Sequence, residues 1–432
     1  LGLGVNRTDV HDASARLAFL VLVPLGIANR KERFRCQVRN GQKSQNVTLQ
    51  EDAKQLDEVV LVGYGAVKKR DATGSVSTVS AKDFNKGAIT SVDGLLNGRT
   101  SGVVVTSSGT PGNDAKIVIR GGSSLQGGND PLIVVDGLPI DGGLSSVNPN
   151  DIESFSILKD ASSTAIYGNR GSNGVILITT KRGSAKEMQV SLNTFTTYNT
   201  LAKKADVYNA SEYANLIRTQ VPDKANLLGY QLYDNLGNPT AERGYENTDW
   251  QSKIFKKTFS SDVNLQVLGN LFNKVPARLS LGNTDNNGIL MTSEFKRTTG
   301  SVSLNPTFFD DHLKINLTAN YAYSFRRNAD EGAIRNAISM DPTKPAYFDP
   351  ENRFGGYFEW TDPETGNPRG PSNPISMLRN RRQIQDVRRY FGNINVEYKF
   401  HFLPELKAIL NAGVDNQDGD ESTSVNPFSR MG

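Results

Sequence analysis

Hydrophobic and polar residues alternate one by one over long stretches of the second half of the chain. In residues 313–326 the odd positions, from Leu313 to Phe325, are apolar or aromatic, whereas the even positions are mostly polar. A period of two places the two kinds of side chain on opposite faces of a β-strand. The same pattern predicts about seven strands, at residues 188–199, 258–269, 277–283, 294–305, 313–326, 388–402 and 406–417.

The predicted strands are long, and their connections alternate in length. Several strands reach about 12 residues or more, whereas strands of globular proteins cluster near 5 or 6 and a tilted membrane-spanning strand needs about 9 to 11. Long connections at 200–257 and 327–387 alternate with short ones such as 403–405. Long loops on one side and short turns on the other are typical of an outer-membrane β-barrel. A secreted β-sandwich with long loops is the alternative.

Residues 66–183 follow a different pattern, which predicts a compact α+β domain. Ser91 as N-cap and Gly98 after the end predict a short helix at 91–97. Short and largely apolar segments predict buried strands at 102–106, 116–120, 132–136, 155–159 and 175–180. A small domain directly ahead of amphipathic strands indicates a plug followed by its barrel. The expected fold class is therefore mainly β, an α+β plug domain followed by a partial antiparallel transmembrane β-barrel.

Composition limits the possible functions. The chain has 49 Lys and Arg against 45 Asp and Glu, a net charge of +4, which is too small an excess to indicate a nucleic-acid partner. Cys36 is the only cysteine and the three histidines are far apart, so we expect no disulfide, no metal site and no cofactor. No nucleophile with its base and no pair of carboxylates stands out, so we expect no catalytic residue and no enzyme.

The sequence resembles the SusC/RagA family of TonB-dependent outer-membrane transporters. The matching segments are LDEVVLVGYG (56–65), IVIRGG (117–122), PLIVVDGLPI (131–140), ILKDASSTAIYGNRGSNGVILITTKRG (157–183), NTDWQ (247–251) and FGNINVEYKFHFLPELKAILNAGVD (391–415). The resemblance implies a multi-pass barrel of about 22 strands, occluded by its plug and surrounded by the lipid of a Gram-negative outer membrane. It also implies import of an oligosaccharide or a peptide. The implied partners are a SusD-like surface lipoprotein and TonB with ExbB and ExbD.

The same resemblance divides the chain into four parts. Residues 1–45 are unassigned, 46–65 hold the end of a regulatory-like domain and the TonB box, 66–183 form the plug, and 184–432 form the first part of the barrel. Since about seven strands cannot close a barrel that holds a plug, the chain is expected to be an amino-terminal fragment. A siderophore or haem transporter and a secreted β-rich binding protein are the alternative functions.

Two groups of residues are candidates for function. The resemblance identifies an extended, β-branched segment as the TonB box, formed by Asp57, Glu58, Val59, Val60, Leu61 and Val62. Such a segment can add as a strand to the sheet of a partner through main-chain hydrogen bonds, and an ordinary plug strand is the alternative. Paired glycines permit tight turns at the plug apex, so we expect substrate contacts there from Gly121, Gly122, Ser123, Gly127, Gly128 and Asn129.

Charged residues in or beside the predicted plug strands form a third group. Unpaired charge against the barrel wall would cost several kcal/mol in desolvation, so we expect pairing. Structural ion pairs between plug and barrel are the preferred interpretation, with ligand binding as the alternative. The residues are Arg120, Lys159, Asp160, Arg170, Lys181 and Arg182.

Overall fold

The computed structural model describes one part of the chain in detail. The described residues are 59–62, 65–68 and 76–431, apart from gaps at 86, 88, 108, 122–127, 142, 161–163, 185–186, 234–237, 273, 349–352, 363–364 and 404. The chain divides into a unit over Leu1–Leu56 and a unit over Asp57–Gly432. All described residues belong to the second unit, so the unassigned segment 1–45 lies outside them. None of the described helices has the length and apolar composition needed to cross a bilayer.

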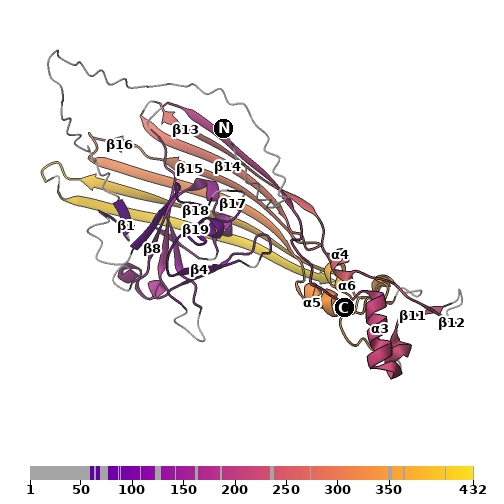
Figure 1. Cartoon of the computed structure of the whole chain (residues 1–432). Helices are drawn as coiled ribbons and strands as arrows, with labels where there is room; N and C mark the ends of the chain where they lie inside the picture. The colour runs from indigo at the N-terminus through magenta and orange to yellow at the C-terminus, as the bar shows by residue number, and fades with distance from the viewer. Residues whose placement is uncertain are drawn as a thin grey trace, which may run out of the picture. The chain divides into compact units, whose positions relative to one another are not determined.

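Seven long strands form one antiparallel sheet (Figure 1). Each strand pairs with the next one, and the short β16 (Thr307–Phe308) pairs with β17 in addition. The seven strands, in sheet order, are β10 (Gln189–Asn199), β13 (Thr258–Leu271), β14 (Val275–Asn287), β15 (Glu294–Leu304), β17 (Leu313–Asn328), β18 (Arg381–Lys399) and β19 (Lys407–Val425). Every strand predicted from the alternating pattern is therefore present, although β18 begins at 381 rather than 388 and β19 ends at 425 rather than 417.

The two faces of this sheet carry opposite kinds of side chain. On β13 the side chains of Asp262 and Asn264 are buried, whereas those of Phe259 and Val263 are 66% and 40% exposed. The apolar face is thus the open one and the polar face is the covered one. A water-soluble sandwich would pack its apolar faces against each other, so this arrangement contradicts the β-sandwich alternative.

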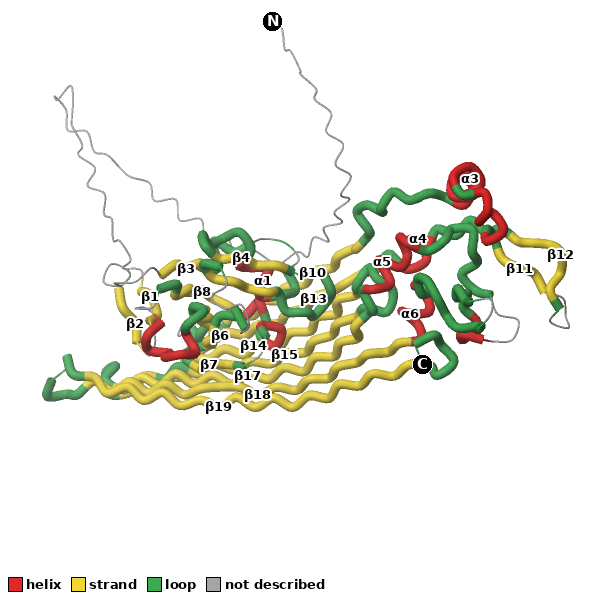
Figure 2. Tube along the Cα trace, turned by 90° about the horizontal axis from the view of Figure 1, so that it is seen from below, coloured by secondary structure: helices red, strands yellow, loops and turns green. Residues whose placement is uncertain are grey.

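The plug lies on the polar face of the sheet (Figure 2). Its five-stranded sheet has the order β3-β8-β9-β6-β7, in which only β6 and β9 run parallel. The five strands are β3 (Val76–Ser80), β8 (Ile152–Leu158), β9 (Val175–Thr180), β6 (Leu132–Val135) and β7 (Leu138–Ile140). The hairpin of β4 (Val103–Thr106) and β5 (Lys116–Ile119) is a separate pair.

The core of the plug is apolar. Phe155, Ile157 and Ile176 are completely buried in it, and Phe391 contributes an aromatic ring from β18 of the large sheet. In the part of the plug that the structure describes there are four short helical elements, and the predicted helix at 91–97 is the first of them. They are α1 (Val92–Leu96), η2 (Leu144–Ser146), η3 (Pro149–Asp151) and η4 (Ala165–Gly171).

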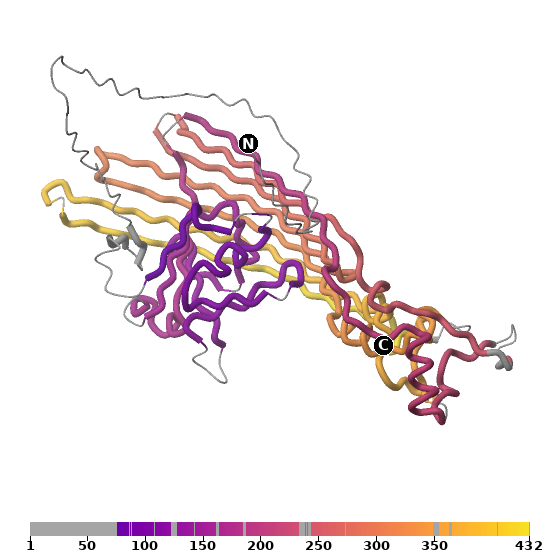
Figure 3. Tube along the Cα trace, viewed as in Figure 1, coloured from indigo at the N-terminus to yellow at the C-terminus, as the bar shows by residue number. Residues whose placement is uncertain are grey.

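The two long connections contain helices that pack together at one end of the large sheet (Figure 3). We call this part the loop layer, defined by residues 200–257 and 329–380. It contains α3 (Ala210–Gln220), η5 (Pro222–Leu227), β11 (Tyr230–Tyr233), β12 (Pro239–Gly244), α4 (Trp250–Ile254), α5 (Gly332–Ser339), η6 (Arg353–Gly356) and α6 (Pro374–Asn380). The loop layer has its own apolar core, in which Ile254, Ala333 and Leu378 are completely buried.

Candidate functional site at the plug interface

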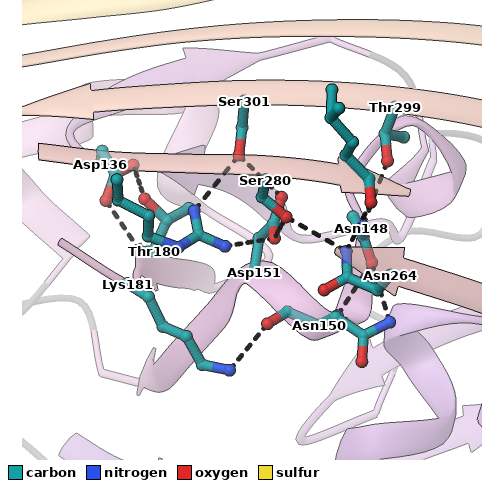
Figure 4. A network of polar contacts seen from close by, with 12 residues as sticks. Asp136, Asn148, Asn150, Asp151, Thr180, Lys181, Asn264, Ser280, Thr299 and Ser301 are labelled. Carbon is teal, nitrogen blue, oxygen red and sulfur yellow. Dashed lines mark hydrogen bonds and ion pairs between the residues drawn. The ribbon is translucent and has the colours of Figure 1, made fainter. Parts of the chain in front are cut away.

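A buried carboxylate anchors the plug to the large sheet. Asp151, at the end of η3, forms an ion pair with Arg278 of β14, and the two side chains are only 7% and 1% exposed. The same carboxylate accepts hydrogen bonds from the hydroxyls of Ser280, at 2.6 Å, and Ser301, at 2.9 Å. Figure 4 shows this cluster between η3 and the strands. Three partners on two strands therefore hold one plug side chain.

A second set of contacts begins three residues earlier. The side-chain amide of Asn148 donates to the Thr299 hydroxyl at 3.1 Å, while its oxygen accepts from the backbone N–H of Asn150. Asn150 in turn donates to Asp262 of β13 at 3.1 Å. The approach is close because Gly282 has no side chain, and a Cβ at that position would overlap the amide of Asn148. Turn η3 therefore touches three neighbouring strands.

Two buried arginines of the sheet reach plug carbonyl groups. Arg297 of β15 donates to the carbonyl oxygens of Ser145, at 3.0 Å, and Thr90, at 3.1 Å. Arg389 of β18 donates to the carbonyl oxygen of Asp141 at 2.5 Å and pairs with Asp415 of β19. Each guanidinium thus lies inside the interface and donates at least one hydrogen bond to the plug backbone.

The interface is polar, and its buried arginines are hydrogen-bonded. Burying a charge is costly unless it is paired and hydrogen-bonded, and here Arg278, Arg297 and Arg389 all have partners. The Nε atom of Arg278 is one buried side-chain atom that lacks a hydrogen-bond partner. Such a surface can hold a plug in place, and its groups can exchange their partners for water when the plug moves.

Burial also shifts the pKa of two ionisable groups that lie outside the long strands of the large sheet. Desolvation raises the pKa of Asp114 in the plug, although the backbone and hydroxyl of Ser145 donate to its carboxylate. In the loop layer, desolvation lowers the pKa of Lys344 to about 8, and the nearby Asp341 opposes this shift. The Lys344 ammonium donates to the carbonyl oxygens of Leu227 and Gly229. Lys344 therefore connects two parts of the loop layer that are far apart in the sequence.

The structure describes part of the proposed TonB box. Val59–Val62 forms β1, which pairs with β2 (Gly65–Lys68) as a two-stranded antiparallel hairpin. Asp57 and Glu58 lie outside the described residues. Among the residues that the structure describes, β1 has no second neighbour in a sheet, so one of its edges is not paired. The assignment as a TonB box stays a prediction.

The structure also describes half of the proposed plug apex. Gly121, Gly128 and Asn129 are described, whereas Gly122, Ser123 and Gly127 lie outside the described residues. The carbonyl oxygen of Gly128 accepts from Asn173, which is within the plug. A different plug segment, residues 109–114, contacts the loop-side ends of β15 and β17. Sequence reasoning missed this segment, although its glycines at 109 and 112 were a visible signal.

Two of the charged plug residues, Arg120 and Arg170, form ion pairs within the plug, so the expected partners in the barrel were wrong for them. Arg120 pairs with Asp160 and Arg170 pairs with Asp141, both inside the plug and both on its surface. Lys181 donates to the carbonyl oxygen of Asn150, which is also in the plug. The charges that do bridge plug and sheet come from residues that the sequence analysis did not single out.

Comparison with known proteins adds three findings. Residues 68–175 match the family model of the TonB-dependent Receptor Plug Domain. The TonB-dependent receptor SusC of Bacteroides thetaiotaomicron is 43% identical over 407 residues, which cover 89% of this chain and 39% of SusC. The TonB-dependent receptor P26 of Formosa agariphila is 32% identical over 412 residues, which cover 94% of this chain and 39% of P26. The chain therefore spans about two fifths of the length of these curated relatives.

The fold has a counterpart among solved structures. The RagAB peptide importer in its open-open state superposes with a TM-score of 0.68 at 24% identity, over 86% of this chain and 44% of that chain. At this level of identity the likeness concerns the fold alone. It shows the same combination of a plug and part of an antiparallel barrel.

Proposed function

Because the chain belongs to the SusC/RagA family of TonB-dependent receptors, we propose that it provides the plug and the first barrel strands of an active nutrient importer. The importer lies in the outer membrane of a Gram-negative cell and carries an oligosaccharide or a peptide. A SusD-like lipoprotein covers its outer side, and TonB with ExbB and ExbD supplies energy from the inner membrane. No covalent chemistry takes place.

One observation carries this proposal. The plug rests on the polar face of a sheet whose other face exposes apolar side chains such as Leu281, at 48%, and Val302, at 40%. An apolar outer face suits contact with lipid, and a polar inner face suits a lumen that holds water and a plug. The polar contacts of Asp151 and Asn148 then hold the plug until it is moved.

The TonB box supplies the link to the energy source in this proposal. Strand β1 has one unpaired edge among the described residues, and an extended edge can accept a partner strand through main-chain hydrogen bonds. Pulling on β1 would then load the plug at its amino-terminal end. Release of the plug from the sheet opens a path for the cargo.

The proposal is tested in the complete receptor by the substitution Val60→Pro. Proline removes a main-chain N–H from β1, so uptake of labelled oligosaccharides or peptides should fall while binding of the same cargo at the cell surface persists. Val67→Pro is the matched control, because Val67 faces Val60 in the β1–β2 pair but lies outside the box. Normal uptake by Val60→Pro, or an equal loss in both variants, would count against the box.

A further inference from the structure

One plug segment lines two cavities and is attached at both ends. Residues 110–114 all line a cavity of about 350 Å³, and Gly112 and Asp114 also line a second cavity of about 200 Å³. Gly112, Asp114, Ser145 and Phe295 line both cavities. The segment therefore borders open space as well as the neighbouring elements.

The outer end of the segment is attached to the loop layer and to β17. The hydroxyl of Thr110 donates to the carboxylate of Glu331, the residue that precedes α5. Arg326 of β17 donates to the carbonyl oxygen of Gly112 at 3.0 Å and to the side chain of Asn113 at 2.7 Å. Helix α5 is built into the apolar core of the loop layer through Ala333. A displacement of α5 would thus pull directly on this plug segment.

The inner end of the segment is attached to the anchors of the plug. Asp114 accepts hydrogen bonds from the backbone N–H of Ser145, at 2.8 Å, and from its hydroxyl, at 3.3 Å. The carbonyl oxygen of Ser145 accepts from Arg297, and the hydroxyl of Ser146 accepts from Arg389. Contiguous contacts therefore run from the loop layer to the two arginines that hold the plug backbone.

At Gly112 the segment approaches the large sheet closely enough to exclude a side chain. It has a φ of +75°, and a Cβ at this position would overlap the ring of Phe295 on β15. Gly109 has the same φ of +75°, but nothing lies within 4 Å of its would-be Cβ. The two glycines therefore form a natural pair for an experiment, because alanine strains the backbone at both and meets a neighbour only at Gly112.

We propose that segment 110–114 couples the loop layer to the plug. Movement of α5 shifts Thr110 through Glu331, the segment turns against Phe295, and Asp114 passes the shift to η2. In the importer proposed above, this coupling would report events at the outer surface to the plug, so its biological role rests on that proposed function. The coupling itself needs neither cargo nor TonB, because all its contacts lie within the chain.

The test is hydrogen exchange, measured by mass spectrometry on the complete receptor in detergent. Gly112→Ala should speed exchange of the amides of α5 and of η2 by about threefold or more, since a strained contact lowers the local opening free energy of whatever is coupled to it. Gly109→Ala should leave both helical elements unchanged. Equal exchange in α5 for the two variants overturns the proposal.

A second pair of variants checks the route. Glu331→Ala removes the acceptor of Thr110, so in its presence Gly112→Ala should no longer affect α5, although η2 should still respond. A persistent effect on α5 shows that coupling bypasses Glu331 and overturns the proposal. If Gly112→Ala does not fold, Arg326→Lys serves in its place, because it removes the guanidinium fork from Gly112 and Asn113. Uptake results for Val60→Pro have no bearing on these outcomes, so the two proposals fail separately.

Discussion

The plug and the large sheet bury opposite kinds of side chain. In the plug, Phe155, Leu158 and Val175 are completely buried, as in the core of a water-soluble domain. In the sheet, Asn264 and Ser280 are each 1% exposed, whereas apolar side chains of the same strands point outward. The plug thus has the apolar core of a water-soluble domain. The sheet has the reverse arrangement, with polar side chains toward the plug and apolar side chains on the other face, which suits contact with hydrocarbon.

The difference bears on how firmly the two regions are joined. Exposing the apolar surface of a core to water costs roughly 25 cal/mol of free energy for every Å². A polar contact that opens to water exchanges one partner for another, at a net cost of about 0.5–1.5 kcal/mol per hydrogen bond. In the importer proposed above, the plug could therefore leave the sheet as a folded body that loses only the ring of Phe391 from its apolar core.

The largest effect is expected from breaking the buried ion pair between the two regions. Asp151→Ala leaves Arg278 as an unpaired charge in a site where it is 1% exposed. Breaking a buried pair from one side costs about 3–5 kcal/mol. We expect urea to release the plug from the sheet at a clearly lower concentration, measured by proteolysis of the plug in the otherwise folded receptor.

Asp141→Ala is the control for that variant. Asp141 is also a plug aspartate paired with an arginine, but the side chains of Asp141 and Arg170 are 90% and 55% exposed. Exposed pairs contribute at most about 1 kcal/mol, so the release midpoint should hardly change. Similar midpoints for the two variants would show that the polar interface does not hold the plug.

A somewhat smaller effect is expected from placing charge on the apolar face. Leu317 of β17 is 38% exposed, between Leu304 and Ile394 on its two neighbouring strands. An arginine facing lipid costs about 2–4 kcal/mol near the bilayer midplane. Leu317→Arg should therefore shift the folding equilibrium of the receptor in lipid vesicles by that amount, and Leu317→Ala by much less. An unchanged equilibrium would mean that this face does not contact lipid.

The sheet could be predicted from the sequence because its signal is local. Alternation within residues 313–326 specifies the strand and both of its faces without knowledge of any neighbour. The prediction failed where the alternation ends. Strand β19 continues to Val425 through a polar stretch, DNQDGDESTSV, whose pairing with β18 is visible only in three dimensions.

The contacts between plug and sheet could not be predicted in the same way. Asp151 and Arg278 are 127 positions apart, and nothing near either residue in the sequence points to the other. Their pairing depends on how the folded plug docks, which is a property of two surfaces. A missed signal existed in the loop layer, where Asn209 and Glu212 form a capping box at the start of α3.

The smallest effect is expected from a single methyl group between the two regions. Gly282 of β14 lies next to the side chain of Asn148. A Cβ on Gly282 would overlap the Asn148 amide and lie 2.6 Å from the hydroxyl of Thr299. Overpacking of this kind costs about 1–3 kcal/mol. Gly282→Ala should push Asn148 away from Thr299 and loosen η3, so that the plug is released at a moderately lower urea concentration.

Gly300→Ala separates this effect from that of alanine itself. Gly300 is also a glycine of the sheet, paired with Leu281 across β14 and β15, but its would-be Cβ finds its nearest neighbour, a methyl of Leu281, at 3.7 Å. That is ordinary contact, so the substitution should leave the plug in place and stabilise the chain slightly by restricting the unfolded state. If Gly282→Ala behaves like Gly300→Ala, the side chain of Asn148 has room to move aside. The plug would then be held by the charges of Asp151, Arg297 and Arg389 rather than by close packing against the sheet.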